Sequence, residues 1–500
     1  MDIKNTIKNI VLNPSAFFLK NSGTKQIIVK NTFWLSFSMV ISKIIKYFLI
    51  IYAARILGAT EYGVFNFALA FVALFNIFAD LGITSLIARE TAKGEESEIH
   101  ISAAFTLKFF LTIATLALVV IASFLVPQAS GIKLTILILS GYILISGFSG
   151  FFYNCFYGRQ EMQYQSITEI ISVTITTALG VYLITLISKA YFLAIAYLVG
   201  AVVGLLIISF IFRKKFGTVL KLDFNKREWK RIFSWSWPLA LGGLFASVYT
   251  NIDSLMMGFW HLFTQIGYYN AAQKIVAMAI LPAGLIATSF FPALTKANSE
   301  QEKKKMQKLF DYQNVILTIL AIPIMVGGYI LANGLIIHIY GTAYQPAVLA
   351  LRILLLMGGI SYLAASSGRV LFIYNQQKRT FWIAVWGALL NVILNIILIP
   401  QWGLYGAAWA SVATFSLALI LLWYYLRKLT PLKIFNWTLI KYLLASIIAS
   451  ILMALILKFL AFYNVDAIIK VIIGALSYFI ILGGFWFLKE KNKNFIFGNK

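Results

Sequence analysis

Residues 31–54 read NTFWLSFSMVISKIIKYFLIIYAA, an apolar stretch in which only Lys43 and Lys46 carry charge. A helix that crosses the hydrocarbon core of a bilayer needs roughly 20 consecutive apolar residues. The stretch therefore predicts a membrane-spanning helix, and its two lysines lie in the middle of that helix, far from both ends.

Similar apolar runs fill almost the whole chain. Of the 500 residues, 61% are hydrophobic and 12% are charged, and the mean hydropathy is +0.85. An ordinary globular protein has about 25% charged and about 45–50% apolar residues. This composition excludes a soluble enzyme and supplies on the order of fourteen spans. The predicted spans are 31–54, 63–88, 102–126, 133–156, 167–188, 190–212, 233–258, 266–292, 309–332, 347–373, 380–400, 403–426, 436–459 and 466–488.

The charges are unevenly distributed along the chain. It has 42 Lys and Arg against 17 Asp and Glu, a formal net charge of +25. In a soluble protein this excess would suggest a nucleic-acid partner, but basic residues of multi-span proteins concentrate in cytoplasmic loops. Every second loop is basic, beginning with the N-terminal tail and ending with the C-terminal one. We therefore predict an even number of spans in the cytoplasmic (inner) membrane, both termini in the cytoplasm, and lipids rather than nucleic acid around the chain.

Short motifs recur in the second half of the chain at nearly constant offsets. Segment 63–66 matches 267–270 and segment 84–85 matches 288–289, both at an offset of 204 residues, and segment 156–160 matches 373–377 at an offset of 217 residues. Matched spans run in the same direction because six spans separate them. In transporters with parallel repeats, an axis along the membrane normal relates the two repeats. Such transporters bind substrate between the repeats and work by rocking one repeat against the other.

The apolar runs and the repeat predict an all-α membrane protein with two similar halves of six spans each, plus two C-terminal helices outside the repeat. The predicted segments are a cytoplasmic N-terminal segment (1–30), an N-lobe (31–212), a basic cytoplasmic linker (213–232), a C-lobe (233–428), spans 13 and 14 (429–488) and a cytoplasmic tail (489–500).

Several motifs, taken in order, resemble a known family. They are LGATEYGVF (57–65), ADLG (79–82) and ARE (88–90) in the first half, and NIDS (251–254), IGYYNAA (266–272) and FPAL (291–294) in the second. With the basic linker and the two extra C-terminal spans, the chain resembles the Wzx-like polysaccharide-transporter flippases of the multidrug/oligosaccharidyl-lipid/polysaccharide exporter superfamily. The resemblance implies two six-helix bundles around a central cavity, an alternating-access cycle and an undecaprenyl-diphosphate-linked oligosaccharide as cargo.

Lys43 and Lys46 are the first candidates for a cargo site. Charged side chains at bilayer depth are costly and by default mark function, and a spacing of three residues places both on one helical face. In one interpretation they attract the diphosphate of a lipid carrier. In the other they pair with acids such as Asp253.

Further polar residues lie within the predicted spans. Asp253 and Asn251 lie in the outer half of span 7, and Lys274, Asn270 and Gln273 in the outer half of span 8. Asp253 and Lys274 could form an ion pair within the membrane, with coupling to H⁺ or Na⁺ as a further hypothesis; otherwise each has its own role. Arg352 near the outer end of span 10 is either a cavity residue or extends its guanidinium toward the interface.

Other charged residues have simpler interpretations. Arg55, Lys108, Arg369 and Lys441 are expected to extend to the interface, and Asp80, Arg89 and Glu90 to pair with one another or cap their helix. Among the deep candidates, Lys43, Lys46 and Lys274 then outnumber Asp253. A net-positive cavity suits an anionic diphosphate and repels organic cations.

Two competing functions are weaker. An H⁺- or Na⁺-coupled drug or metabolite antiporter would need an acidic site, and Asp253 is the only well-buried acid in the predicted spans. A membrane glycosyltransferase or polymerase would need acidic catalytic residues, yet no Asp-x-Asp motif occurs, and His100, His261, His338 and the single Cys155 lack metal-site spacing. The sequence therefore predicts a protein that is not an enzyme and requires no cofactor or metal. The resemblance implies a lipid-linked oligosaccharide as its substrate, with polysaccharide polymerase or export machinery as candidate partners.

Overall fold

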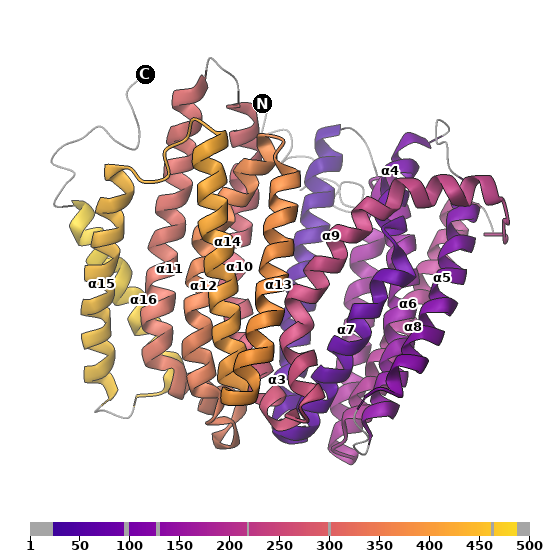
Figure 1. Cartoon of the computed structure of the whole chain (residues 1–500), viewed down its shortest axis with the longest axis horizontal. Coiled ribbons are helices and arrows are strands. Elements are labelled where there is room, and N and C mark those ends of the chain that lie inside the picture. Colours follow the sequence, from indigo (N-terminus) through magenta and orange to yellow (C-terminus); the bar gives the residue numbers. More distant parts are fainter. Residues whose placement is uncertain are drawn as a thin grey trace, which may run out of the picture. The chain divides into compact units, whose positions relative to one another are not determined.

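The computed structural model describes residues 24–94, 100–126, 131–217, 220–298, 302–461 and 465–487, and all of its regular secondary structure in these ranges is helical (Figure 1). The helices are α3 (Thr24–Asp80), α4 (Ile83–Lys93), α5 (Ile101–Ser123), α6 (Ile132–Gly158), α7 (Met162–Leu186), α8 (Ala190–Phe216), α9 (Lys226–Phe259), α10 (Phe263–Lys296), α11 (Lys303–Tyr340), η3 (Thr342–Tyr344), α12 (Ala347–Ile373), α13 (Gln377–Trp402), α14 (Leu404–Leu429), α15 (Trp437–Ala461) and α16 (Ala467–Phe487).

The helices account for each of the fourteen predicted spans. Twelve helices of the described part of the chain are long and apolar enough to cross a membrane. One of them, α3, contains the first predicted span and most of the second, while α9 corresponds to the seventh. Helix α9 is not among the twelve, and its first turns carry the charged residues Lys226, Arg227, Glu228, Lys230 and Arg231. The predicted class, an all-α membrane protein, is confirmed.

The second predicted span, 63–88, is interrupted. Helix α3 continues through a non-helical Gly58 (φ 70°, ψ 172°) and ends at Asp80. Leu81 and Gly82 then adopt left-handed conformations (φ 42° and 78°), and α4 begins at Ile83. A glycine takes positive φ without a Cβ clash, so Gly82 permits a break that the apolar pattern alone does not reveal.

Residues 1–264 form one compact unit. Its core includes Ile87 of α4, Ala104 of α5, Phe152 of α6 and Phe212 of α8, all buried. Helix α9 packs against α3, α4 and α5 in this unit, although the sequence analysis assigned it to the second lobe. The compact unit ends at Thr264, and the predicted lobes with their basic linker stay a prediction.

Residues 265–500 form the second compact unit. Helix α12 packs between α11 and α14, and α13 forms a hairpin with α14. The two additional C-terminal helices, α15 and α16, lie beside α11 (Figure 1). Their attachment includes a hydrogen bond from the Tyr478 hydroxyl to the Ile319 carbonyl at 2.8 Å.

The α13–α14 hairpin depends on one close backbone approach. A Cβ added at Gly406 would lie 2.2 Å from the Leu398 carbonyl oxygen, so the two backbones would have to separate. We expect Gly406→Ala to destabilise the protein by about 1–3 kcal/mol, as overpacking does. Gly368 of α12 is the matched control, because a Cβ there meets nothing within 4 Å. Thermal unfolding in detergent should show the loss for Gly406→Ala alone; equal stabilities for both variants would contradict the close approach.

Most of the predicted N-terminal segment (1–30) and the tail (489–500) lie outside the described residues. The basic linker (213–232) is largely described. Its first four residues end α8, and its last seven begin α9.

Candidate functional site

The first half of α3 presents distinct faces. One face is an exposed apolar stripe, made of Phe33, Phe37, Val40, Ile44 and Phe48, which are 42–62% exposed. Ser42 and Leu49 are buried on another face. Successive helical residues are separated by about 100°, so Lys43 lies about 100° and Lys46 about 200° around the helix from Ile44. The two lysines therefore lie outside the apolar stripe.

The ammonium of Lys46 is directed toward other helices of its own unit. Tyr142 of α6, Glu169 of α7 and Tyr197 of α8 all lie within electrostatic range of it. The Tyr142 and Tyr197 rings meet edge to face, with centroids 5.2 Å apart and an interplanar angle of 83°. The Lys46 side chain is nevertheless exposed on the surface of the chain, and within the described ranges it donates no hydrogen bond.

Lys43 lies one helical turn before Lys46. Its side chain is half-buried. No carboxylate of the described residues forms a contact with it that would count as an ion pair. Whether the lysines attract a diphosphate or pair with acids such as Asp253 stays open, and Glu169 is an acid within electrostatic range of Lys46.

The sequence analysis missed Glu169. It is half-buried, and Tyr153 of α6 also lies within its electrostatic range. The predicted span began at residue 167, which placed Glu169 at the mouth of the helix. Helix α7 instead begins at Met162, so Glu169 lies two turns inside it. The start of α7 at Met162, five residues before the predicted start of the span, is what places Glu169 inside the helix.

Lys108 belongs to a second charged cluster. Its Nζ donates to Asp80 Oδ1 at 2.5 Å and to Thr84 Oγ1 at 3.3 Å, and its side chain is only 2% exposed. The Thr84 hydroxyl also donates to Asp80 Oδ1. The expectation that Lys108 extends to the interface was therefore wrong. A buried ammonium here links the end of α3, the start of α4 and the middle of α5.

Glu90 is fully buried and is paired as the sequence analysis expected. Its Oε1 lies 3.0 Å from Arg89 Nε and 3.1 Å from Lys93 Nζ. Asp80, which was grouped with Arg89 and Glu90, pairs instead with Lys108. Arg89, Glu90 and Lys93 of α4 thus form a cluster at the end of the helix, with two basic side chains around one buried carboxylate.

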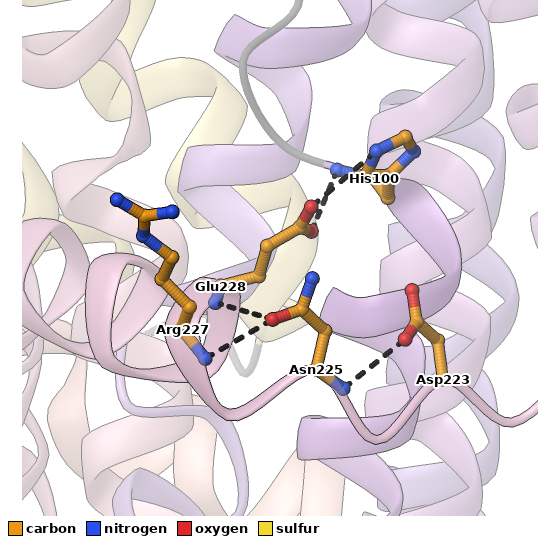
Figure 2. Close-up of polar contacts among 5 residues, drawn as sticks. All are labelled: His100, Asp223, Asn225, Arg227 and Glu228. Carbon is orange, nitrogen blue, oxygen red and sulfur yellow. Dashed lines mark hydrogen bonds and ion pairs between the residues drawn. The ribbon is translucent and has the colours of Figure 1, made fainter.

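The start of α9 is attached to the start of α5 (Figure 2). The Glu228 carboxylate accepts the His100 backbone N–H at 3.2 Å and lies 3.4 Å from His100 Nε2. Asn225 caps α9, its Oδ1 accepting the N–H groups of Arg227 and Glu228. The Asp223 N–H donates to Thr106 Oγ1 of α5 at 2.9 Å. These contacts order the connection before α9.

A similar contact fixes the turn between α7 and α8. Glu61 of α3 lies 2.8 Å from Lys189 Nζ and accepts the Ala190 N–H at 2.9 Å. The hydrogen bond and the charge of Glu61 raise the pKa of Lys189, which is exposed. A carboxylate at the N-terminus of α8 also complements the helix dipole.

The remaining candidates divide between the two units. Asp253 of α9 is buried, and the half-buried Asn251 donates its Nδ2 to the Ser247 carbonyl at 2.9 Å. Both belong to the first unit, whereas Lys274 belongs to the second. An ion pair of Asp253 with Lys274 would join the two units and stays a prediction.

In the second unit, the candidates on α10 and α12 have local partners. Asn270 is buried and donates to the Ile266 carbonyl at 3.0 Å, while Gln273 and Lys274 are half-buried. Arg352 donates its Nε to the Tyr329 carbonyl at 3.3 Å and places its guanidinium 4.9 Å from the centre of that ring. Tyr329 thus holds Arg352 against α11.

Metal binding has no obvious site in the described part of the chain. No group of three or more His, Cys, Asp or Glu side chains that could hold a metal ion occurs in those ranges. The single cysteine, Cys155, is buried. Charged side chains of the first unit that lie near other helices include Lys46, Glu169 and the Lys108–Asp80 pair.

Comparison with known proteins gives consistent matches. Residues 28–298 match the family model described as "Polysaccharide biosynthesis protein". The chain is 24% identical over 434 residues to Agl15 of Haloferax volcanii, named "Probable low-salt glycan biosynthesis flippase", covering 85% of this chain and 88% of that protein.

Solved structures share the fold. The lipid II flippase MurJ in its inward closed conformation superposes with a TM-score of 0.71 at 19% identity, covering 89% of this chain and 99% of that one. An inward-facing multidrug-resistance transporter of the MATE family gives a TM-score of 0.62 at 15% identity, covering 84% and 97%. At these identities the likeness concerns the fold alone.

Proposed function

Because the chain belongs to the polysaccharide biosynthesis protein family, we propose that it is a flippase that moves undecaprenyl-diphosphate-linked oligosaccharides across the cytoplasmic membrane by alternating access. The family and the name of the Haloferax relative support a flippase of glycan precursors. The diphosphate-linked cargo is our extension. Its main support is the position of Lys43 and Lys46 on a face of α3 that is not its apolar stripe.

The chemistry of that face suits a lipid diphosphate. Ammonium groups bind phosphate oxygens through charge-assisted hydrogen bonds, which are stronger than neutral ones. Lys46 is exposed and has neutral tyrosines beside it, so a phosphate could approach it without displacing a tight ion pair. Glu169 reduces the local positive charge, and the predicted excess of lysines over acids in the cavity is smaller than the sequence suggested. Lys274 and Arg352 of the second unit are proposed as further contacts with cargo.

The proposed function also includes an orientation of the chain in the membrane and coupling of transport to an ion. We propose that both termini lie in the cytoplasm, and the distribution of Lys and Arg supports this orientation. Movement of cargo makes and breaks no covalent bond, so the protein acts as a transporter and not as an enzyme. We propose coupling to H⁺ or Na⁺, with Asp253, Asn251, Asn270 and Gln273 as candidate residues, and delivery of cargo to a polysaccharide polymerase or to export machinery.

Reconstitution tests the proposed activity. Proteoliposomes containing the protein and a fluorescent undecaprenyl-diphosphate oligosaccharide should expose the sugar of both leaflets to an externally added glycosidase. Liposomes without protein should expose only the outer leaflet. Equal exposure in both preparations, under an applied H⁺ or Na⁺ gradient as well, would exclude the activity.

The alternative is a drug or metabolite antiporter. The MATE neighbour shares the fold, and Glu169 is a second acid within the helices, which the sequence analysis had not counted. However, Glu169 lies beside Lys46, so an organic cation would meet an ammonium at the same place. Cells that overproduce the protein should therefore keep their susceptibility to cationic dyes, whereas raised resistance with unchanged surface polysaccharide would favour the antiporter.

A further inference from the structure

We propose that Glu169 is a displaceable counter-ion of Lys46: it neutralises the ammonium when no cargo is bound, and the cargo diphosphate displaces it. Glu169 would thereby set how tightly the transporter holds its anionic cargo and how readily it releases it. This inference rests on the proposed function, and it concerns a residue that the sequence analysis did not select.

Packing within one unit fixes the two helices that carry the pair. Ser38 of α3 donates to Ser166 of α7 at 3.1 Å. Farther along both helices, Leu49 of α3 packs on Gly180 of α7, where an added Cβ would lie 2.9 Å from Leu49 Cδ1. The two contacts bracket Glu169 and show that α3 and α7 run in the same direction.

Helix α7 is in turn fixed against α8. The Ser172 hydroxyl donates to the Gly200 carbonyl at 2.8 Å, and a Cβ at Gly200 would collide with the Thr176 side chain. Small residues let membrane helices approach this closely. Glu169 therefore cannot move far from Lys46 through a shift of α7 alone, and any exchange of partners must occur through side-chain movement.

The helix register makes the pair loose. From the Ser38–Ser166 contact, Lys46 lies five residues farther along its helix than Glu169 does, about 7.5 Å at 1.5 Å per residue. The long side chains narrow this gap to electrostatic range, but no contact within 4 Å joins them among the described residues. By contrast, Lys108 and Asp80 of the same unit approach to 2.5 Å. Separating the Lys46 and Glu169 charges should therefore cost less free energy than separating Lys108 from Asp80.

The groups around the pair are neutral. Tyr153 of α6 lies within range of Glu169, and Tyr142 of α6 and Tyr197 of α8 lie within range of Lys46. Among the described residues that interact electrostatically here, Lys46 and Glu169 are the charged ones, and Lys43 lies one turn from Lys46 on the same helix. A diphosphate carries more negative charge than one carboxylate, and it can bind Lys43 and Lys46 together because they share a helical face. It should thus outcompete Glu169 for Lys46.

Binding measurements on the full-length protein in nanodiscs test the proposal. The probes are inorganic pyrophosphate and farnesyl diphosphate, which share the diphosphate but differ in the lipid tail. Glu169→Gln should tighten binding of both probes by roughly three- to tenfold, because it removes a competing negative charge. Lys46→Gln should weaken binding, and in that background Glu169→Gln should have no further effect. Glu161→Gln, at the N-cap of the same helix, is the matched control and should leave binding unchanged.

The outcomes separate the two proposals. If Lys46→Gln weakens binding but Glu169→Gln leaves it unchanged, the counter-ion role is wrong and the diphosphate site stands. If Lys46→Gln has no effect on either probe, the diphosphate site itself is wrong. A Glu169→Gln effect confined to farnesyl diphosphate would place Glu169 beside the lipid tail and overturn the counter-ion role. Should Glu169→Gln fold poorly, Glu169→Asp serves instead: its shorter carboxylate should tighten binding by less, and unchanged or weaker binding would count against the proposal.

Discussion

Simultaneous replacement of Lys43 and Lys46 by alanine is expected to abolish export of surface polysaccharide while the protein stays at its normal level in the membrane. The two ammonium groups lie on a face of α3 separate from its exposed apolar stripe. Each is proposed to compensate part of the diphosphate charge that otherwise opposes entry of the cargo into a space of low dielectric constant. Removal of both would leave that charge without a partner on α3.

The structure also indicates why the substitutions should leave folding intact. Lys46 is exposed and Lys43 is half-buried, and within the described ranges neither forms a hydrogen bond or a close ion pair. Truncation of such side chains changes stability little. A loss of export can therefore be attributed to the cargo step and not to unfolding.

Two control variants make the measurement specific. Lys441→Ala removes an exposed lysine of α15 whose ammonium lies 5.4 Å from the centre of the Trp437 ring, and it should export normally. The double Lys43→Arg, Lys46→Arg variant retains both positive charges and should export more than the double alanine variant. Normal export by the double alanine variant would remove both lysines from the mechanism.

The sequence predicted the helices well because each one depends on a local property. A run of about 20 apolar residues is visible without knowledge of its neighbours, and each predicted span has its helix. The boundaries were less certain. The break at Leu81–Gly82 depends on two residues with positive φ. It falls in the ADLG motif (79–82), which the predicted span 63–88 ran through without a break.

The partners of charged residues could not be predicted in the same way. Lys108 resembles a lysine that extends to the interface, and only the packing of α5 beside the end of α3 brings it to Asp80. Likewise, Glu169 is 123 residues from Lys46 in the sequence, and their proximity depends on the contact of α3 with α7. Pairings of this kind are set by the tertiary arrangement, which a single sequence does not show. The role of Lys46 stays a prediction, and Glu169 is an acid near it that the sequence did not suggest.

The buried Lys108–Asp80 pair gives the second large effect, which concerns stability. Asp80→Asn would leave the Lys108 ammonium, 2% exposed, without a negative partner. Removal of one member of a buried ion pair typically costs about 3–5 kcal/mol, because the other charge stays buried and uncompensated. We therefore expect Asp80→Asn to be among the most destabilising conservative substitutions in the first unit.

The two members of the pair should not be equivalent. Asp80 is 26% exposed at its side chain, so water can solvate it when Lys108 is replaced. Lys108→Met should therefore destabilise less than Asp80→Asn. The double variant removes both charges and should recover much of the loss caused by Asp80→Asn, since buried ion pairs can often be exchanged for apolar residues at little net cost.

The exposed pair of Lys305 and Glu302 supplies the control. Lys305 Nζ lies 2.8 Å from Glu302 Oε1, yet the two side chains are 57% and 38% exposed, and such pairs contribute about 0–1 kcal/mol. Apparent melting temperatures in one detergent should therefore fall in the order Glu302→Gln, Lys108→Met, Asp80→Asn, with Asp80→Asn the lowest. If Asp80→Asn has the same apparent melting temperature as Glu302→Gln, water must reach the Lys108 ammonium when its partner is removed. The linkage of α3, α4 and α5 would then rest on apolar packing and not on the buried charge.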